Sequence, residues 1–515
     1  MNITKYRTIS FLFICWLLFT AGCTSMNADK NINKNAKKVT VIHHLSANTL
    51  DPHNSWAALR AGAVETLVKL DSELKPSPWL AAEWKAQDKL TWIFTIRENI
   101  NFHDGSNMDA AAVKSSLERA LKANQSLSRA LNISSMEAQG QQLTIVTAEP
   151  NPALPSELVN PYTSIISTAA ENKVGTSAFN HAPIGTGPFR VTSFAPDREI
   201  KLVRNENYWD TPAILDEVSY QFNEDANVRM MALQTKEVDI AYQLPAESLA
   251  VLEQDNQFHV KSIPGLRVHY LIYNANRPHM KDIQVRKALD LLINRQTITQ
   301  DLMLGHAQPA NGPFPTILPF GSDDKITALN SLHASELLDK AGYQRNADGK
   351  LEKDGSPLKL QLITYKTRPE LPLIAQLIQS EAAKLGIEIE IKLVENVDAH
   401  LRESDQWDLV TYSNLSAPRG DGGYFLNAAY QKGGALNPGN VEVSKLTPTL
   451  EQLNSTESIP TRIQLSKEAV SLIQKEVPHS YLVYPNNVIG VNNRVLNWTP
   501  GAEEYYIITN KIDVN

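Results

Sequence analysis

Two adjacent histidines, His43 and His44, are the residues whose type and position most favour metal chemistry. Neutral imidazole nitrogens are good ligands for divalent transition-metal ions. The pair ends a short segment beginning at Val39, where the run Val-Thr-Val-Ile is typical of a β-strand. Because neighbouring side chains of a strand point to opposite faces, we expect only one of the two imidazoles to reach a site at the strand's end. The pattern does not say which of the two it is.

Arg368 and Arg419 follow two predicted strands of one sheet. The elements predicted around them are a strand at 358–365, an amphipathic helix at 371–385 and strands at 387–393 and 407–412. A strand–helix–strand unit of this length implies a parallel pair with a right-handed crossover. Ligands bind beyond the carboxyl ends of such strands, and a guanidinium holds a carboxylate through two parallel hydrogen bonds. We therefore expect the two arginines to bind an anionic group.

The sequence contains none of the short motifs that mark common catalytic or nucleotide sites. It has no His-Glu-x-x-His, no Gly-x-Ser-x-Gly, no phosphate-binding Gly-Lys-Ser/Thr loop and no dinucleotide glycine fingerprint. Residues 346–350 (NADGK) faintly resemble a calcium loop, but the glycine is misplaced and the closing glutamate is missing. We therefore expect no enzymatic activity.

Composition further narrows the class of protein to which the chain can belong. The chain has 515 residues, of which 42% are hydrophobic and 20% charged, so it can bury large cores and is not a disordered chain. The formal net charge of −7 argues against a nucleic-acid binder, which normally concentrates lysine and arginine.

The first 22 residues predict an export signal. Lys5 and Arg7 precede a short apolar run at 9–19, and Thr20-Ala21-Gly22-Cys23 follows. This ending resembles a bacterial lipobox, which would make Cys23 the lipidated first residue of the mature protein. It departs from that pattern at Thr20, where leucine is usual, and an ordinary signal peptide is the alternative. Residues 23–38 then predict a flexible tether.

Seven blocks in order resemble the peptide/nickel-binding family of ABC-transporter solute-binding proteins. They are LDPH at 50–53, ETLV at 65–68, LAAEW at 80–84, FTIRENINFHDG at 94–105, PIGTGPF at 183–189, RNENYW at 204–209, and VRKAL at 285–289 together with INR at 293–295. The resemblance extends over about residues 38–510. It implies an extracytoplasmic protein, lipid-anchored to a bacterial membrane, that acts as a monomer with ABC permease and ATPase subunits.

The same resemblance implies an α/β, two-lobed periplasmic-binding-protein-like fold with a hinge. Lobe I would comprise residues 39–268 and 484–515, with an extra subdomain at about 81–174, and lobe II residues 269–483. The chain would cross between the lobes near 265–273 and near 478–485. A ligand shifts such a protein toward its closed form.

Members of this family bind mainly peptides or nickel complexes. We expect a nickel complex with a small carboxylate-bearing chelator, such as free histidine, as transported ligand and no resident cofactor. His44 or His43, together with His479, would approach the metal, and Arg368 and Arg419 would hold carboxylates. Trp56 and Tyr412 are the expected wall of the site.

An oligopeptide is the alternative ligand. Asp421 lies where peptide-binding relatives often place an acidic anchor for the ligand's amino terminus. Two departures from nickel-binding relatives also weaken the nickel assignment: Asn160 stands before Pro161 where some of them have arginine, and residues 432–434 (KGG) lack a histidine that some of them use.

Overall fold

The computed structural model describes residues 36–322 and 325–515. Within it, Lys37–Asn515 forms one compact unit. The predicted signal peptide and Cys23 lie outside the described residues, as does all of the predicted tether before residue 36. Among the residues described, we find no helix with the length and apolar character that a bilayer crossing needs.

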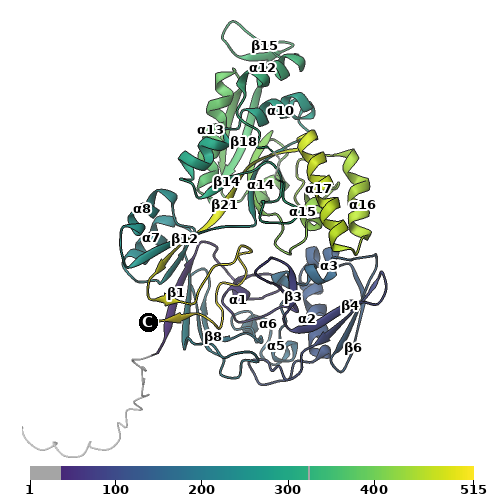
Figure 1. Ribbon diagram of the computed structural model, residues 1–515, viewed down its shortest axis with the longest axis vertical. Coiled ribbons are helices and arrows are strands. Elements are labelled where there is room, and N and C mark those ends of the chain that lie inside the picture. The colour runs from purple at the N-terminus through teal and green to yellow at the C-terminus, as the bar shows by residue number, and fades with distance from the viewer. Residues whose placement is uncertain (1–35, 323–324) are drawn as a thin grey trace, which may run out of the picture. The chain divides into compact units, whose positions relative to one another are not determined.

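A mixed sheet of twelve strands forms the centre of the molecule (Figure 1). Its main path has the order β19-β18-β20-β13-β21-β11-β1-β10-β9-β8, and β12 and β14 pair with β21 beside that path. Its strands are β1 (Lys38–His43), β8 (Phe189–Ala195), β9 (Glu199–Arg204), β10 (Glu217–Phe222), β11 (Ile240–Tyr242), β12 (Phe258–Pro264), β13 (Arg267–Tyr273), β14 (Ala307–Pro309), β18 (Lys359–Tyr365), β19 (Glu388–Val394), β20 (Leu409–Leu415) and β21 (His479–Asn492).

Strand β21 joins the two halves of this sheet. Its first residues, from His479 to Val483, pair with β13, whereas its last seven, from Asn486 to Asn492, pair with β12. The chain passes directly from β12 to β13 through Gly265, beside Asn487 of β21. Two adjacent segments therefore connect the halves, which is the arrangement that a hinge between two lobes needs. The exact lobe boundaries stay a prediction.

The predicted parallel unit is confirmed. Strand β18 pairs in parallel with β19 and with β20, and the fifteen-residue helix α13 (Glu370–Lys384) connects β18 to β19. Helix α2 (Ala110–Ala123) follows Asp109, whose carboxylate accepts a hydrogen bond from the Ala112 N–H at 2.9 Å. That side chain satisfies one of the donors that every helix leaves free at its start.

A second sheet of four strands lies within the segment predicted to be a subdomain. Its order is β4-β5-β7-β6, and α2 packs on it with Val113 and Leu117 fully buried. The strands are β4 (Ala81–Ala86), β5 (Thr91–Ile96), β6 (Ile133–Gln139) and β7 (Gln142–Thr147). Smaller strands are β2 (Val68–Leu70), β3 (Pro76–Pro78), β15 (Gln344–Arg345), β16 (Leu351–Lys353), β17 (Ser356–Pro357), β22 (Val495–Leu496) and β23 (Asp513–Val514).

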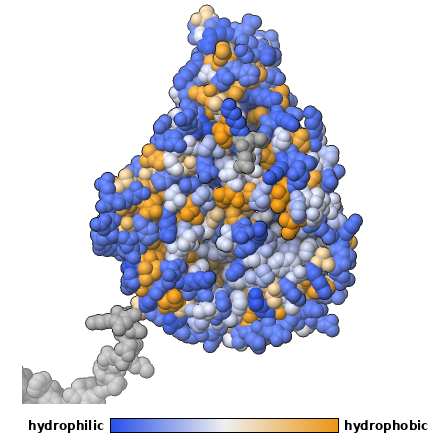
Figure 2. Space-filling model, viewed as in Figure 1, coloured by the Kyte–Doolittle hydropathy of each residue, from blue (hydrophilic) through white to orange (hydrophobic). Residues whose placement is uncertain are grey.

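Helices cover the sheets and leave a mostly polar surface. Figure 2 shows a face dominated by hydrophilic residues with scattered apolar ones. The remaining helices are α1 (Ala57–Arg60), α3 (Gln125–Leu131), α4 (Leu154–Glu157), α5 (Thr168–Val174), α6 (Thr176–Phe179), α7 (Ala226–Gln234), α8 (Leu249–Glu253), α9 (Pro278–Lys281), α10 (Ile283–Leu291), α11 (Arg295–Thr297), α12 (Ser331–Lys340), α14 (Val397–Glu403), α15 (Gly423–Tyr430), α16 (Thr447–Ser455) and α17 (Ile459–Glu476).

Candidate ligand-binding site

The carboxyl ends of two parallel strands define the candidate site. Strand β18 has a parallel neighbour on each side, and so does β1, which pairs with β10 and β11. At such a switch in strand order the connecting segments leave a crevice in which α/β proteins bind ligands. Arg368 follows β18 and His44 follows β1. Each of these predicted residues therefore lies where this type of sheet binds a ligand.

The two histidines at the end of β1, His43 and His44, lie side by side. Their rings stack with centroids 4.5 Å apart and planes 25° from parallel. The expectation that they point to opposite faces is wrong, because β1 ends at His43 and strand alternation no longer governs His44. His43 Nδ1 accepts a hydrogen bond from the Leu45 N–H at 3.0 Å. His44 is buried, and neither of its ring nitrogens has a hydrogen-bond partner in the part of the chain that the structure describes.

Both imidazoles are neutral near pH 7. Burial holds the pKa of His43 and of His44 well below the usual range. The positive charges of Arg60, Arg229 and Arg368 lower both pKa values further. A neutral imidazole has one nitrogen with a free lone pair, which is the form that binds a metal ion. His44 is therefore a neutral imidazole whose ring nitrogens have no hydrogen-bond partner among the described residues, and its role as a metal ligand stays a prediction.

Arg368 is a buried cation near these rings. Its side chain is 6% exposed, and burial and the neighbouring Arg267 lower its pKa to about 10, so it stays charged at pH 7. The two carboxylates near it are held by other side chains: Glu504 takes two hydrogen bonds from Arg267, at 3.1 Å each, and Glu370 lies 2.7 Å from His269 Nε2. The positive charge of Arg368 is thus available to an anionic ligand.

Sequence reasoning missed Arg60, which belongs to the same cluster. It ends the short helix α1, and its guanidinium lies 5.1 Å from the centre of the Trp56 ring. The pattern Trp56-x-x-x-Arg60 places the two side chains on one helix face, and this spacing was the only signal in the sequence. The burial of the arginine could not be predicted, because the segment that covers it, around Glu504, is distant in sequence.

The predicted wall residues lie in aromatic clusters. Trp56 packs edge-on against Tyr505 at 5.2 Å and near Tyr162 at 6.0 Å. Tyr412 lies 5.8 Å from Tyr270, and its hydroxyl donates a 2.5 Å hydrogen bond to Asp398. Trp56 adjoins Arg60, so it borders the cluster of buried arginines. The role of Tyr412 stays a prediction.

Two predicted anchors already have protein partners. Arg419 forms a buried ion pair with Glu157 and lies 4.1 Å from the centre of the Tyr424 ring. Asp421 accepts hydrogen bonds from Arg462 at 2.9 and 2.7 Å. To bind a ligand, either residue would have to exchange a charged partner inside the protein for the ligand.

His479 lies in another environment. It begins β21, and its ring centre is 5.6 Å from that of Tyr270 and 5.3 Å from that of Tyr430. Burial lowers its pKa to about 4. Within residues 36–322 and 325–515, no group of three or more His, Cys, Asp or Glu side chains could hold a metal ion. The described protein residues alone therefore leave most coordination positions of a metal to other ligands.

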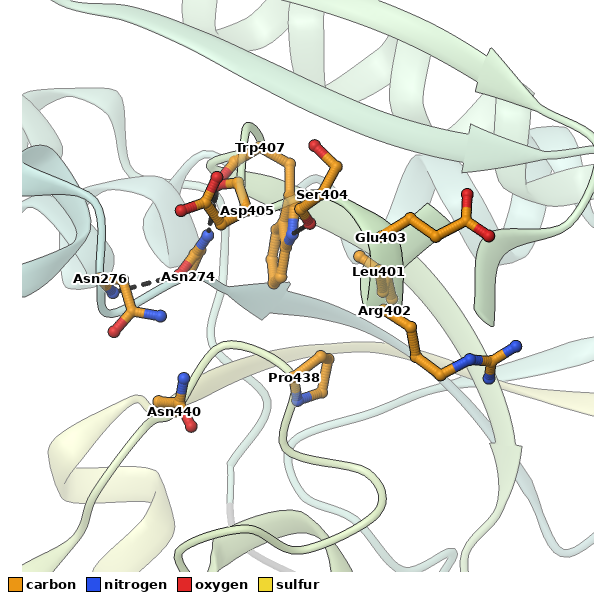
Figure 3. A pocket seen from close by; sticks show the side chains of 10 residues that line it. All are labelled: Asn274, Asn276, Leu401, Arg402, Glu403, Ser404, Asp405, Trp407, Pro438 and Asn440. Carbon is orange, nitrogen blue, oxygen red and sulfur yellow. Dashed lines mark hydrogen bonds between the residues drawn. The ribbon is translucent and has the colours of Figure 1, made fainter. Parts of the chain in front are cut away.

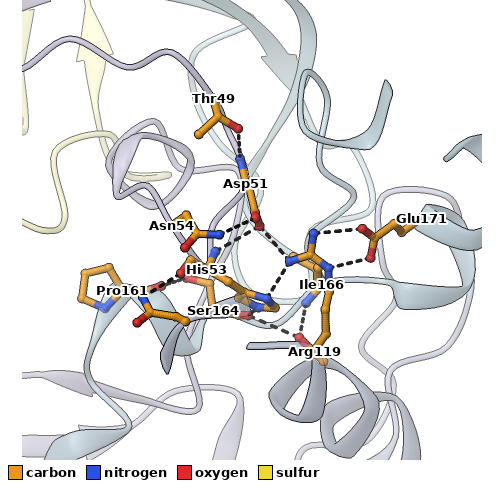
Figure 4. A network of polar contacts seen from close by, with 11 residues as sticks. Thr49, Asp51, His53, Asn54, Arg119, Pro161, Ser164, Ile166 and Glu171 are labelled. Carbon is orange, nitrogen blue, oxygen red and sulfur yellow. Dashed lines mark hydrogen bonds and ion pairs between the residues drawn. The ribbon is translucent and has the colours of Figure 1, made fainter. Parts of the chain in front are cut away.

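His53, in the block LDPH at 50–53, is already bound by other residues of the protein. His53 Nδ1 lies 2.8 Å from Arg119 Nη1, and its Nε2 lies 3.0 Å from the carbonyl oxygen of Ser164 (Figure 4). Arg119 also binds Asp51 and Glu171, so the network connects the segment after β1 with α2 and α5. The block LDPH at 50–53 therefore has a structural role here.

A polar surface hollow lies away from this site. Its volume is about 340 Å³, and Figure 3 shows Asn274, Trp407 and Arg402 among its lining side chains. In the register of β13 with β20, Tyr273 pairs with Leu409, at the end of the sheet opposite to Arg267 and Leu415. The hollow thus lies at the other end of the strands from Arg368.

Comparisons with known proteins fit this geometry. The family profile "Bacterial extracellular solute-binding proteins, family 5 Middle" matches residues 75–437. The nickel-binding protein NikA of Staphylococcus aureus is 33% identical over 504 residues, which cover 98% of each chain. The glutathione-binding protein GsiB of Escherichia coli is 28% identical over 466 residues, which cover 87% of this chain and 89% of GsiB.

Solved structures confirm the two-lobed periplasmic-binding-protein-like fold. A nickel ABC transporter structure from Bacillus halodurans is 41% identical, with a TM-score of 0.77, and the match covers 93% of this chain and all of that one. Staphylococcus aureus NikA in complex with Ni(L-His)2 is 33% identical with a TM-score of 0.83, over 93% of this chain and all of that one.

Proposed function

This chain belongs to family 5 of the bacterial extracellular solute-binding proteins, and we propose that it captures nickel as a complex with a small carboxylate-bearing chelator for an ABC importer. Free histidine is the chelator that we favour. The nickel complex is cargo, to be released to permease subunits, and we propose no catalytic step.

One observation carries this proposal: His44 is a buried, neutral imidazole with both nitrogens unpartnered, within reach of the charge of Arg368. An unpaired buried polar group is costly, so such a ring is expected to have a partner when the site is filled. A nickel ion suits the imidazole, and a chelator carboxylate suits the guanidinium. The 33% identity to a nickel-binding protein over the whole chain supports the same cargo.

A site that offers few protein ligands suits a chelated metal ion better than a bare one. His44 supplies one nitrogen to nickel, and His43 is the second candidate, although its Nδ1 already accepts a hydrogen bond. A chelator then fills the other positions. His479 remains a proposed third ligand, and it would have to leave its aromatic neighbours to reach the others.

A peptide is the second candidate cargo, because GsiB, a glutathione-binding protein, is 28% identical over 87% of this chain. A free carboxylate to hold the peptide's amino terminus would support it. Asp421 gives both oxygens to Arg462, which makes it a weak anchor for an ammonium group.

Isothermal titration calorimetry separates the two cargoes. We expect one-site binding of nickel with two equivalents of L-histidine, and much weaker binding of nickel alone, of glutathione and of a tripeptide panel. Equal binding of the peptides, without heat that depends on metal, would refute the nickel proposal.

Single variants then test the ligand set. We expect His44→Ala to weaken binding of the nickel–histidine complex most and His43→Ala less. His479→Ala is the third variant, and the ring that it removes is as deeply buried as those of His43 and His44. Unchanged affinity in all three variants would refute the proposal that histidines of the protein bind the metal.

We further propose that the protein is monomeric and anchored through a lipid on Cys23. The basic start, the apolar run and the small residues before Cys23 support this anchor. Cys23→Ala is expected to release the protein from the membrane fraction and abolish incorporation of labelled fatty acid. Gel filtration of the protein without its lipid anchor measures the oligomeric state and so tests whether it is a monomer.

A further inference from the structure

We infer that Arg60 is a second anion-binding residue of the cargo site, positioned by Glu504, so that the cargo class is a metal chelate with at least two carboxylates. This inference rests on the proposed function and names a residue that the sequence did not identify. Arg60 and Arg368 would each hold one carboxylate, with His44 at the metal.

Arg60 has one free donor group at a fully enclosed position. Its side chain is 4% exposed, and its Nε donates a hydrogen bond to the Glu504 carbonyl oxygen at 3.0 Å. Its Nη2 is buried without a hydrogen-bond partner among the described residues. A buried guanidinium that lacks a partner is costly, so a ligand oxygen at this nitrogen would remove a penalty.

Neighbouring residues fix the direction of this guanidinium. The Trp56 ring lies against one side of it, at 5.1 Å. The Glu504 carbonyl oxygen holds the Nε edge and leaves the Nη atoms on the other edge. A guanidinium held in this way loses little freedom when it binds a carboxylate, which favours tight and selective binding.

Glu504 has a strained backbone that serves two arginines at once. Its φ is +63°, in the left-handed region that side chains other than glycine rarely adopt. This conformation lets its carbonyl oxygen accept from Arg60 while its carboxylate binds Arg267. Strain of this kind is typical of functional sites. Burial by itself raises the pKa of Glu504. The charges of Arg267 and Arg368 outweigh burial and lower the pKa to about 2, so the carboxylate stays ionised.

The charges of the cluster then favour an anion. Arg267 donates to both oxygens of Glu504, at 3.1 Å, and this carboxylate forms no hydrogen bond with Arg60 among the described residues. The positive charges of Arg60 and Arg368 both act on Glu504 and on the two histidines at the end of β1. Arg229, the third arginine whose charge acts on His44, already donates to backbone carbonyl oxygens of Asn223, Tyr242 and Gln243. Arg60 and Arg368 would then each match one of two carboxylates carried by one chelate.

The test compares two nickel complexes that differ in the carboxylates. Calorimetry gives the ratio of affinities for nickel with two equivalents of L-histidine and nickel with two equivalents of L-histidinamide. We expect wild-type protein to prefer the histidine complex. Arg60→Met is expected to reduce this preference by about tenfold to a hundredfold, the range for a charge-assisted hydrogen bond. Arg368→Met should act similarly, and Glu504→Gln by a smaller factor.

Two control variants make the outcome specific. Arg402→Met, at the exposed end of α14, removes the same charge far from the cluster and should leave the preference unchanged. Arg60→Lys keeps the charge without the planar fork and should give an intermediate preference. If Arg60→Met fails to fold, as judged by thermal melting, Arg60→Lys decides the question.

The failures are distinguishable. A folded Arg60→Met or Arg60→Lys variant with the wild-type preference overturns the role of Arg60 while the nickel proposal stands. If wild-type protein binds neither nickel complex, the proposed function fails and the inference with it. Loss of affinity for both complexes by the same factor would show a structural role only, and would also overturn the inference.

Discussion

Loss of the carboxylate of Glu157 is expected to weaken cargo binding through its pair with Arg419 rather than through a contact with the cargo. Glu157 ends α4 in the predicted first lobe, and its partner Arg419 lies after β20 in the predicted second lobe. Their side chains are only 12% and 9% exposed. We infer that the pair forms when the lobes close and separates into water when they open, so that it affects only the closed form.

The magnitude follows from the burial of the pair. Glu157→Leu leaves Arg419 buried without its partner, and removal of one member of a buried pair costs about 3 kcal/mol or more. The open form does not bear this cost, so cargo affinity falls by about a hundredfold. The double variant Glu157→Leu with Arg419→Met should recover most of that loss. Burial raises the pKa of Glu157, and the charge of Arg419 lowers it by less.

Calorimetry with nickel and L-histidine measures the four affinities of this cycle. Glu118→Leu is the matched control, because its pair with Lys114 at 3.7 Å is largely exposed and should change affinity less than about twofold. Small-angle scattering of the cargo-free variants should show a more open average form for Glu157→Leu alone. A single variant with wild-type affinity, or a double variant as weak as the single one, would refute the closing role of the pair.

Three further expectations concern closure, stability and the alternative cargo. Gly420→Ala should weaken cargo binding, because its new methyl group would lie 2.4 Å from a backbone oxygen of the segment between β2 and β3. Gly433→Ala is the control, since Gly433 has the same φ of +73° and its new methyl group would have nothing within 4 Å. Equal cargo affinities of the two variants would contradict the prediction. Burial raises the pKa of Glu65 from 4.5 to about 7, so the folded chain favours the protonated carboxyl and loses about 3 kcal/mol of stability as pH rises between those values. The melting temperature of Glu65→Gln should therefore rise relative to that of wild type as pH increases over that range. A difference in melting temperature that does not change with pH would contradict the expected direction. Asp421→Asn should lower the melting temperature, because it weakens the pair with Arg462, and should leave any tripeptide binding unchanged; a selective loss of tripeptide affinity would restore Asp421 as a peptide anchor.

Local patterns predicted the fold well where neighbouring residues decide the structure. The alternation of apolar and charged residues after Gly386 marks β19, and the side chain of Asp109 marks the start of α2. The position of Arg368 after a parallel strand followed from the predicted strand–helix–strand unit, because ligands bind at the carboxyl ends of such strands. The stacking of His43 on His44 was not predictable, because alternation fails where the strand ends.

Partners that are distant in sequence could not be predicted. Arg60 meets Glu504 across 444 residues, and Arg419 meets Glu157 across 262. No local pattern says which buried charge a distant segment will neutralise, so the sequence made Arg419 look free and gave no sign that Arg60 is buried. The anion-binding role assigned to an arginine therefore depends on the charges around it in the folded chain.

This difference changes how the two arginines are expected to work. A guanidinium that already holds a protein carboxylate gains little from a second one, whereas a guanidinium with a buried, unpartnered nitrogen gains a full charge-assisted hydrogen bond. Arg419 already holds the carboxylate of Glu157 and has only its Nε without a partner, whereas Arg60 holds no carboxylate among the described residues and its Nη2 is buried without a partner. Arg419 should then affect all cargoes alike, through closure, while Arg60 should distinguish cargoes by their carboxylates. The ratio of affinities for the histidine and histidinamide complexes separates the two roles, because only the second one changes it.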